Sequence, residues 1–362
     1  MFRDIESQYS YGLELREPAD NFAVLTAFEF LNDYKLEAQK AKQRVWGQAM
    51  SMQAGHPGQL FFQIFKTAAK RKLDARLNID WFSRLTSEAG INSTIPVKSI
   101  IGKGDYHKFF KNRNEEAFRD LINSGVNVNF LNPPDKIQKI FPFLGRNHIK
   151  IYIVDNVAWL GGVNICDASF NAIDFVVKIT NPRIVDVLTE EFEFSNQEKT
   201  DDQVVTENGT LFIDSGEAGQ SIILDEAQFM VNTAQKKVRN ISFFTPDGPF
   251  LKSLKDAHDR GVDVEVLKPS ETSGIYVLLD LVNKVNMNIK RRKVPFTEVH
   301  DSVHAKLLII DDESVLFGSH NLMKSGVNAG TQEIAFYSTN PILVRNLINF
   351  YNKARNGEFK QN

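Results

Sequence analysis

Two short segments of the chain repeat one polar pattern at the edge of an apolar run. Each holds a His, a Lys two residues later and an Asp five residues after that, in RNHIKIYIVD at 146–155 and SVHAKLLIID at 302–311. Imidazole supplies a nucleophile or a proton carrier, and ammonium supplies positive charge, so each copy carries groups that suit displacement at a phosphorus atom. The candidate catalytic residues are therefore His148, Lys150, Asp155, His304, Lys306 and Asp311.

Both segments alternate like strands, which places the His and the Lys of each copy on one face. Two polar residues at the start of an otherwise apolar strand indicate that this end opens into a cleft. Asp155 and Asp311 fall at the other end, each followed by a turn-forming residue and a second apolar run, which predicts a hairpin. By parity they face away from the His and the Lys, so we favour a structural role for both over direct chemistry.

The hairpins continue the repetition. Gly161-Gly162 in the first copy matches Gly318-Ser319 in the second, and an Asn follows two residues later in each. Small residues allow backbone N–H groups to approach an anion closely. We therefore predict a phosphate-binding role for Gly162, Asn164, Ser319 and Asn321. An acid follows each His at a similar distance, Asp174 in one copy and Glu333 in the other, and a carboxylate can orient and tune an imidazole. The sequence leaves open which acid serves which His.

The repetition covers most of the chain. Residues 38–80 and 233–269 both read as helix, strand, Gly/Pro turn, helix and strand, and a further helix is predicted at 114–125 and at 273–285. His148 and His304 are 156 residues apart, so each copy is a unit of domain size. We predict an α/β fold of two tandem domains, 1–200 and 201–362, related by a pseudo-twofold axis. Each would hold a mixed central sheet flanked by helices, and the polar segment 195–210 would connect them.

Composition narrows the function classes. The chain has 362 residues, a net charge of −2 and one cysteine, so neither a disulfide framework nor a cysteine-based metal site can be built. We see no signal peptide and no run of about 18 apolar residues, and expect a cytoplasmic protein with at most peripheral membrane contact. Facing repeats would bring two His, two Lys and two Asn into one cleft. No acidic cluster has metal-ligand spacing, so we predict a site that needs neither metal nor cofactor. The chemistry would need unlike pKa values for the two His, one neutral and one charged.

These motifs resemble those of the phospholipase D superfamily, whose signature is His-x-Lys-x4-Asp followed by Gly-Gly/Ser-x-Asn. HIKIYIVDNVAWLGGVNICD and HAKLLIIDDESVLFGSHNLMKSG look most like the two motifs of bacterial cardiolipin synthases. The resemblance implies a phosphatidyl-histidine intermediate, with His148 as the nucleophile and His304 as the acid and base. Two features depart from that group: no N-terminal transmembrane helix is visible, and the Arg-Ser that commonly follows the second Asn reads Lys324-Ser325.

Three functions therefore stay open. The first is a phospholipase D or phosphatidyltransferase acting on phospholipids, for which a monomer suffices; the apolar loop within 136–148 would suit acyl chains, although core packing explains it equally well. The second is a nuclease of the same superfamily, which the basic run at 290–294 favours and the net charge disfavours. The third is a silent binding protein, which two intact motifs disfavour. The lipid head group, the acceptor and the oligomeric state are not readable from the sequence.

Overall fold

The computed structural model describes residues 21–85, 104–138, 144–197, 200–270, 294–299 and 302–359. The predicted helix at 273–285, most of the basic run at 290–294 and residues 139–143 of the apolar loop lie outside these ranges. The predicted helix at 114–125 is confirmed as part of a longer helix, α5 (Gly104–Asn123).

The first half of the chain forms a seven-stranded mixed sheet in the order β1-β7-β6-β5-β2-β3-β4. The pairs β2–β3 and β3–β4 are parallel and the others are antiparallel. Its strands are β1 (Phe22–Thr26), β2 (Arg44–Ala49), β3 (Asp74–Asp80), β4 (Asn127–Leu131), β5 (Ile151–Val154), β6 (Val157–Gly161) and β7 (Phe175–Ile179).

The second half forms an eight-stranded mixed sheet in the order β12-β11-β10-β13-β14-β15-β9-β8. Apart from the additional strand β8, this order repeats that of the first sheet, with β9 in the place of β1 and β15 in the place of β7. Its strands are β8 (Asp202–Thr206), β9 (Gly209–Asp214), β10 (Lys237–Ile241), β11 (Asp263–Pro269), β12 (Phe296–Val299), β13 (Leu307–Ile310), β14 (Ser314–Gly318) and β15 (Glu333–Ser338).

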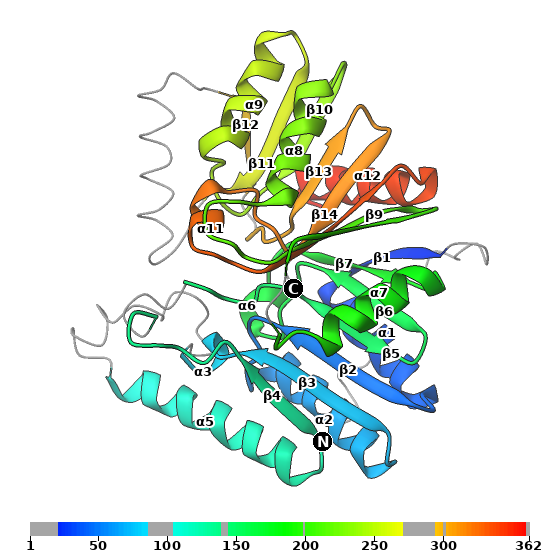
Figure 1. Ribbon diagram of the computed structural model, residues 1–362, viewed down its shortest axis with the longest axis vertical. Helices are drawn as coiled ribbons and strands as arrows, with labels where there is room; N and C mark the ends of the chain where they lie inside the picture. Colours follow the sequence, from blue (N-terminus) through cyan, green and yellow to red (C-terminus); the bar gives the residue numbers. More distant parts are fainter. Residues whose placement is uncertain are drawn as a thin grey trace.

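Helices cover both sheets and also fill the space between them (Figure 1). On the first sheet, α1, α2 and α5 bury their apolar faces against one side, and α8 and α9 do the same on the second sheet. The other described helices are short or lie on the opposite faces. Beyond α5, the bounds are α1 (Ala27–Lys40), α2 (His56–Lys70), α3 (Phe82–Leu85), α6 (Asp167–Phe170), α7 (Pro182–Glu193), α8 (Ile222–Thr233), α9 (Gly248–Asp259), α11 (Lys324–Asn328) and α12 (Pro341–Arg355).

One apolar core belongs to both repeats. It combines residues of β5, β6, β7 and α7 with residues of β13, β14, β15 and α12. Phe175 illustrates the packing, because its ring lies 5.8 Å from that of Phe317 and 4.8 Å from that of Phe350. Burying apolar surface of this extent at the junction fixes the two sheets relative to each other. The predicted α/β fold of two related repeats, each a mixed sheet with helices, is confirmed.

The predicted face alternation also holds, with one correction. Ile149, Ile151 and Ile153 enter the shared core, as do Ala305, Leu307 and Ile309. The His-x-Lys residues themselves do not lie in regular strands but in the extended segments directly before β5 and β13.

The polar segment 195–210, which was expected to connect the two domains, also contributes to the second sheet. It contains β8, which pairs with β9 and adds an edge strand to the second sheet. Within the described residues, the structure contains no helix with the length and apolar character needed to cross a bilayer.

Candidate active site

Two isolated parallel bridges join the repeats next to the two His residues. Asn147 pairs with Gln332, and Ile173 pairs with Val303. The backbone N–H of His148 donates to the Gln332 carbonyl at 2.9 Å, and that of His304 donates to the Ile173 carbonyl at 2.9 Å. Each bridge therefore sets one His beside a predicted acid of the other repeat. Glu333 is the first residue of β15, and Asp174 directly precedes β7.

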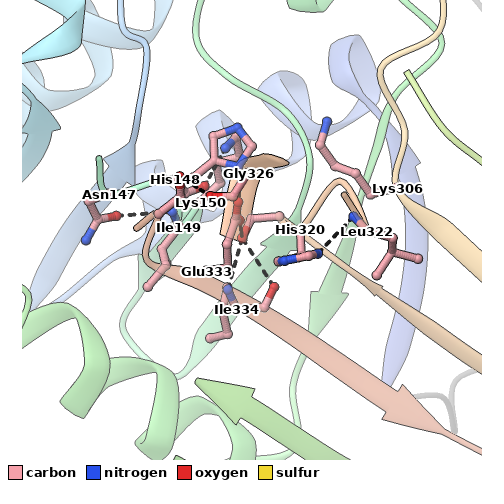
Figure 2. Close-up of polar contacts among 12 residues, drawn as sticks. Asn147, His148, Ile149, Lys150, Lys306, His320, Leu322, Gly326, Glu333 and Ile334 are labelled. Carbon is pink, nitrogen blue, oxygen red and sulfur yellow. Dashed lines mark hydrogen bonds and ion pairs between the residues drawn. The ribbon is translucent and has the colours of Figure 1, made fainter. Parts of the chain in front are cut away.

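Each imidazole is hydrogen-bonded to a carboxylate from the opposite repeat. His148 Nδ1 lies 2.9 Å from both carboxylate oxygens of Glu333, and His304 Nδ1 lies 2.6 Å from Oδ2 of Asp174 (Figure 2 shows the first pair). All four side chains are largely buried. A carboxylate at Nδ1 fixes the ring orientation and leaves Nε2 for chemistry. The pairing that the sequence left open is therefore crossed between the repeats.

Both motif lysines are buried beside these rings. The Nζ atoms of Lys150 and Lys306 donate to the backbone carbonyls of His148 and His304, and Lys306 Nζ also lies 3.0 and 3.1 Å from the two ring nitrogens of His304. Burial lowers the pKa of Lys150 to about 7 and that of Lys306 to about 8, with Glu333 and Asp174 opposing the shift. Among the partners that the described residues provide, neither Nζ atom has a hydrogen bond to a carboxylate.

The same surroundings disfavour protonation of both imidazoles. Burial and the charge on Lys306 lower the pKa of His304 to about 4, although Asp174 acts in the other direction. Burial, followed by the charges of Lys150 and Lys306, holds the pKa of His148 well below its ordinary value. His304 also contributes to the shift of His148, and Lys150 to that of His304, so the two motifs share one electrostatic environment.

The two carboxylates differ in their own surroundings. Burial raises the pKa of Glu333, against the opposing effects of His320, Lys150 and a hydrogen bond from Ser319. Burial also acts to raise the pKa of Asp174, but contact with His304 and Lys306 and the Phe175 N–H keeps it below its ordinary value. The surroundings thus favour the ionised form of Asp174 more strongly than that of Glu333.

Gly162 and Ser319 occupy equivalent positions and contact these acids. A Cβ atom on Gly162 would lie 2.4 Å from Oδ1 of Asp174, so glycine leaves the room that this carboxylate occupies. At the equivalent position the Ser319 hydroxyl donates to Glu333 Oε2 and accepts the Ile334 N–H at 2.9 Å. The structure thus places both small residues against the carboxylates that bind the imidazoles. Their role in admitting a phosphate to the backbone stays a prediction.

The two motif asparagines are held differently. Asn164 accepts the Ser51 N–H through Oδ1 at 3.1 Å, which ties it to the segment after β2. Asn321 Oδ1 is buried and has no hydrogen-bond partner among the residues that the structure describes. A phosphate-binding role for both remains a prediction.

The structure does not bring Asp155 and Asp311 to the imidazoles. Each lies in the hairpin turn at the far end of β5 or β13 and has a positive φ, 46° and 55° respectively. Asp155 accepts the N–H groups of Lys42, Gln43 and Arg44 at 2.8–3.0 Å. Asp311 accepts those of Gln235, Lys236 and Lys237 at 2.7–2.9 Å. These contacts fasten the hairpin to the start of the neighbouring strand.

Two buried features next to the site were not predicted from the sequence. Arg146 and Asp80 form an ion pair at 3.2 Å with side chains 1% and 0% exposed, and Asp80 also accepts the Asn147 N–H at 2.8 Å. The pair fixes the segment that leads to His148. His320 is the second feature, a third buried histidine beside Glu333 (Figure 2). Strand alternation places Arg146 on the same face as His148, and this pattern could have indicated the ion pair. His320 has Val163 at the equivalent position of the first repeat, so the repeat pattern did not indicate it.

Comparison with known proteins gives one family and several relatives. The profile of the family described as "Cardiolipin synthase, PLD-like domain" matches residues 35–195 and 229–354. Cardiolipin synthase 1 of Staphylococcus epidermidis is 24% identical over 213 residues, which cover 52% of this chain and 43% of that protein. A cardiolipin synthase of Staphylococcus aureus is 25% identical over 199 residues, covering 49% and 40%. The chain thus matches less than half the length of these curated relatives.

Among solved structures, a phosphatidylserine synthase of Haemophilus influenzae superposes with a TM-score of 0.65 at 14% identity, covering 95% of this chain and 87% of that one. At this identity the likeness shows a shared fold.

Proposed function

This chain belongs to the cardiolipin synthase family of phospholipase D-like domains, and on this premise we propose that it is a phosphatidyltransferase or phospholipase D acting on phospholipids. The observation that carries the proposal is the crossed pairing of two imidazoles with two carboxylates around two buried lysines. This set contains a nucleophile, a proton donor and positive charge, which are the groups that phosphodiester exchange requires.

In the first step His148 attacks the phosphorus atom. Glu333 accepts the proton on Nδ1, so the lone pair on Nε2 forms the P–N bond while the bond from phosphorus to the leaving alcohol breaks. His304, oriented by Asp174, gives a proton to that alcohol. The non-bridging oxygens meet the ammonium groups of Lys150 and Lys306, which stabilise the charge that builds up in the transition state.

In the second step His304, now neutral, removes a proton from an incoming hydroxyl. The hydroxyl oxygen attacks phosphorus, the P–N bond breaks and His148 returns to its starting state. A lipid alcohol as the acceptor gives transfer, and water gives hydrolysis. No step requires a metal ion.

The experiment is a panel assay with EDTA present throughout. Phospholipid vesicles containing phosphatidylglycerol are incubated with the protein, and release of the head-group alcohol and formation of a new phospholipid are measured beside nicking of single- and double-stranded DNA. Lipid turnover without nicking supports the proposal. Nicking without lipid turnover overturns it in favour of a nuclease, and inactivity in both arms overturns enzymatic function.

A trapping experiment tests the nucleophile. Brief reaction with phospholipid labelled in the phosphatidyl group, followed by denaturation in alkali, preserves a phosphohistidine, which is labile in acid. We expect label on the peptide that contains His148, and label confined to the His304 peptide would reverse the assignment of the two roles.

A further inference from the structure

We propose that His320 is a positioning residue for His148, acting through the turn that carries Ser319, and that only the second repeat contains such a device. The inference rests on the proposed function, because it concerns how the nucleophile of that reaction is held. It assigns a role to a buried histidine that lies outside both His-x-Lys motifs.

Hydrogen bonds hold His320 at both ring nitrogens. Its Nδ1 accepts the Leu322 N–H at 2.8 Å, so the neutral ring carries its proton on Nε2. Nε2 lies 3.5 Å from Oγ of Ser221, which accepts the Leu224 N–H and is hydrogen-bonded to Asp214. His320 is 6% exposed, and Leu322 has a φ of 53°, a strained conformation for a leucine. His320 therefore pins a turn whose backbone is not intrinsically favoured.

The residue before His320 delivers the functional contact. Ser319 donates its hydroxyl proton to Glu333, and Glu333 accepts Nδ1–H of His148. This matters because a protonated Glu333 would donate to Nδ1, and the proton of His148 would then occupy Nε2, the atom that must attack phosphorus. Burial raises the pKa of Glu333, and the hydroxyl that Ser319 donates acts in the opposite direction by favouring the carboxylate.

In the described part of the first repeat, the equivalent positions carry no such arrangement. Val163 stands in the place of His320, and Gly162 in the place of Ser319. In the strand register Thr26 pairs with Phe175 and Ile213 pairs with Ile334, so Ala27 corresponds to Asp214. The polar chain from Asp214 through Ser221 to His320 therefore supports only the carboxylate that serves His148. This asymmetry agrees with unlike roles for the two imidazoles.

The test replaces His320 by the residue of the first repeat. In His320→Val the turn loses both ring hydrogen bonds, whereas His320→Asn keeps an acceptor and a donor on a shorter side chain. Ile223→Val is the packing control, because Ile223 lines the same small cavity as His320 and carries no polar group. The charged or titratable groups around His320 are Glu333, His148, Lys306 and, through Ser221, Asp214.

The first readout needs no substrate. In protein with 15N-labelled histidine, the low-field Nδ1–H proton signals of His148 and His304 are assigned by their loss in His148→Asn and His304→Asn. We expect His320→Val to broaden or shift the His148 signal while that of His304 stays in place, and His320→Asn to restore it. The positioning role is wrong if both signals stay in place in His320→Val. It is also wrong if both signals move and the control Ile223→Val moves them in the same way.

The second readout is kinetic. We expect His320→Val to lower kcat by about tenfold or more with KM within about twofold, and to move the acidic limb of the kcat profile to higher pH as Glu333 protonates more readily. His320→Asn should recover most of the rate. A loss of rate that merely follows the loss of thermal stability, with an unchanged pH profile, would overturn the inference. A wild-type protein inactive on every phosphodiester would instead count against the proposed function, and the substrate-free readout would still decide on His320.

Discussion

Glu333 belongs to the second repeat, yet its carboxylate lies 2.9 Å from Nδ1 of His148 in the first. Asp174 and His304 form the reciprocal pair at 2.6 Å. Both imidazoles are therefore oriented only while the two repeats are docked.

The first prediction concerns these pairs. We expect Glu333→Gln to lower kcat by about 10³-fold or more. A carboxylate only accepts a hydrogen bond and so favours the tautomer of His148 with its proton on Nδ1, whereas an amide can also donate and loses this preference. His148 and Glu333 act as one unit, so Glu333→Gln combined with His148→Asn should be no slower than His148→Asn alone. Steady-state rates of the two single variants and the double variant check this. If the loss of kcat in the double variant equalled the product of the two single losses, the two residues would act independently.

The second prediction concerns Gly162. Gly162→Ala places a Cβ atom 2.4 Å from Oδ1 of Asp174 and must displace that carboxylate from His304. We expect a loss of kcat of at least about tenfold. Gly326→Ala is the matched control, because a Cβ atom there meets nothing within 4 Å. Equal rates for the two variants would contradict the role assigned to Gly162.

The third prediction concerns the buried Lys150. Burial lowers its pKa to about 7 in the folded protein, from an ordinary value near 10.5. The unfolded chain therefore binds more protons between about pH 7 and 10.5, so this residue destabilises the fold increasingly as the pH falls through that window and by a constant amount below it.

Lys150→Met should consequently be inactive but more stable, with a Tm raised by several degrees at pH 6–7 and a difference that shrinks toward pH 10. Thermal unfolding of both proteins across this pH range is the measurement. If Lys150→Met were less stable than the wild type at pH 6, the prediction would be wrong, because contacts of the charged Lys150 would then outweigh the cost of burying it.

The fourth prediction concerns Asp155. Replacing it by Ala leaves three backbone N–H groups without their acceptor. It also places an alanine at a φ of 46°, a conformation that L-residues rarely adopt. We expect a loss of roughly 1–3 kcal/mol in the free energy of unfolding, with kcat changed far less than in Glu333→Gln. Asp155→Asn, which tolerates positive φ and keeps one acceptor oxygen, should recover part of the stability.

Urea unfolding and kinetics, with Asp311→Ala as the equivalent change in the second repeat, check this prediction. A kcat reduced about 10³-fold at unchanged stability would instead place Asp155 in the chemistry.

The fifth prediction concerns His304. Burial and the charge on Lys306 lower its pKa to about 4, which would leave little imidazolium near neutral pH. A bound phosphate adds negative charge that offsets the ammonium groups, so we expect inorganic phosphate to raise the pKa of His304 by about 1 unit or more. Histidine NMR titrations with and without phosphate measure the shift, and exposed His258 is the internal control. An unchanged midpoint at saturating phosphate would contradict the expected rise in the pKa of His304.

Local sequence patterns predicted what depends on local structure. The alternation around His148 and His304, the hairpins at Asp155 and Asp311, and the duplicated order of elements follow from periodicity and turn residues. Asp174 and Glu333 were named as acids, but their crossed assignment depends on how two distant halves dock, which no local pattern encodes.

His320 shows a second limit. Comparing the two repeats finds only the residues that both copies share, and the residue of the first repeat that corresponds to His320 is Val163. Its hydrogen bonds to Leu322 and its approach to Ser221, almost 100 residues earlier in the chain, become visible only in the folded protein. The additional strand β8 was missed for a related reason, because its exposed polar residues read as a linker.

The apolar core that both sheets share also bears on assembly. If the two repeats of one molecule separated, each would expose the apolar surface that packs against the other repeat, and a repeat of a second molecule could bind there. Each repeat also carries the acid that is hydrogen-bonded to the histidine of the other repeat. Two molecules that exchanged halves would thus regenerate two complete catalytic centres, so reciprocal swapping into dimers would preserve activity, whereas a lone half would have none.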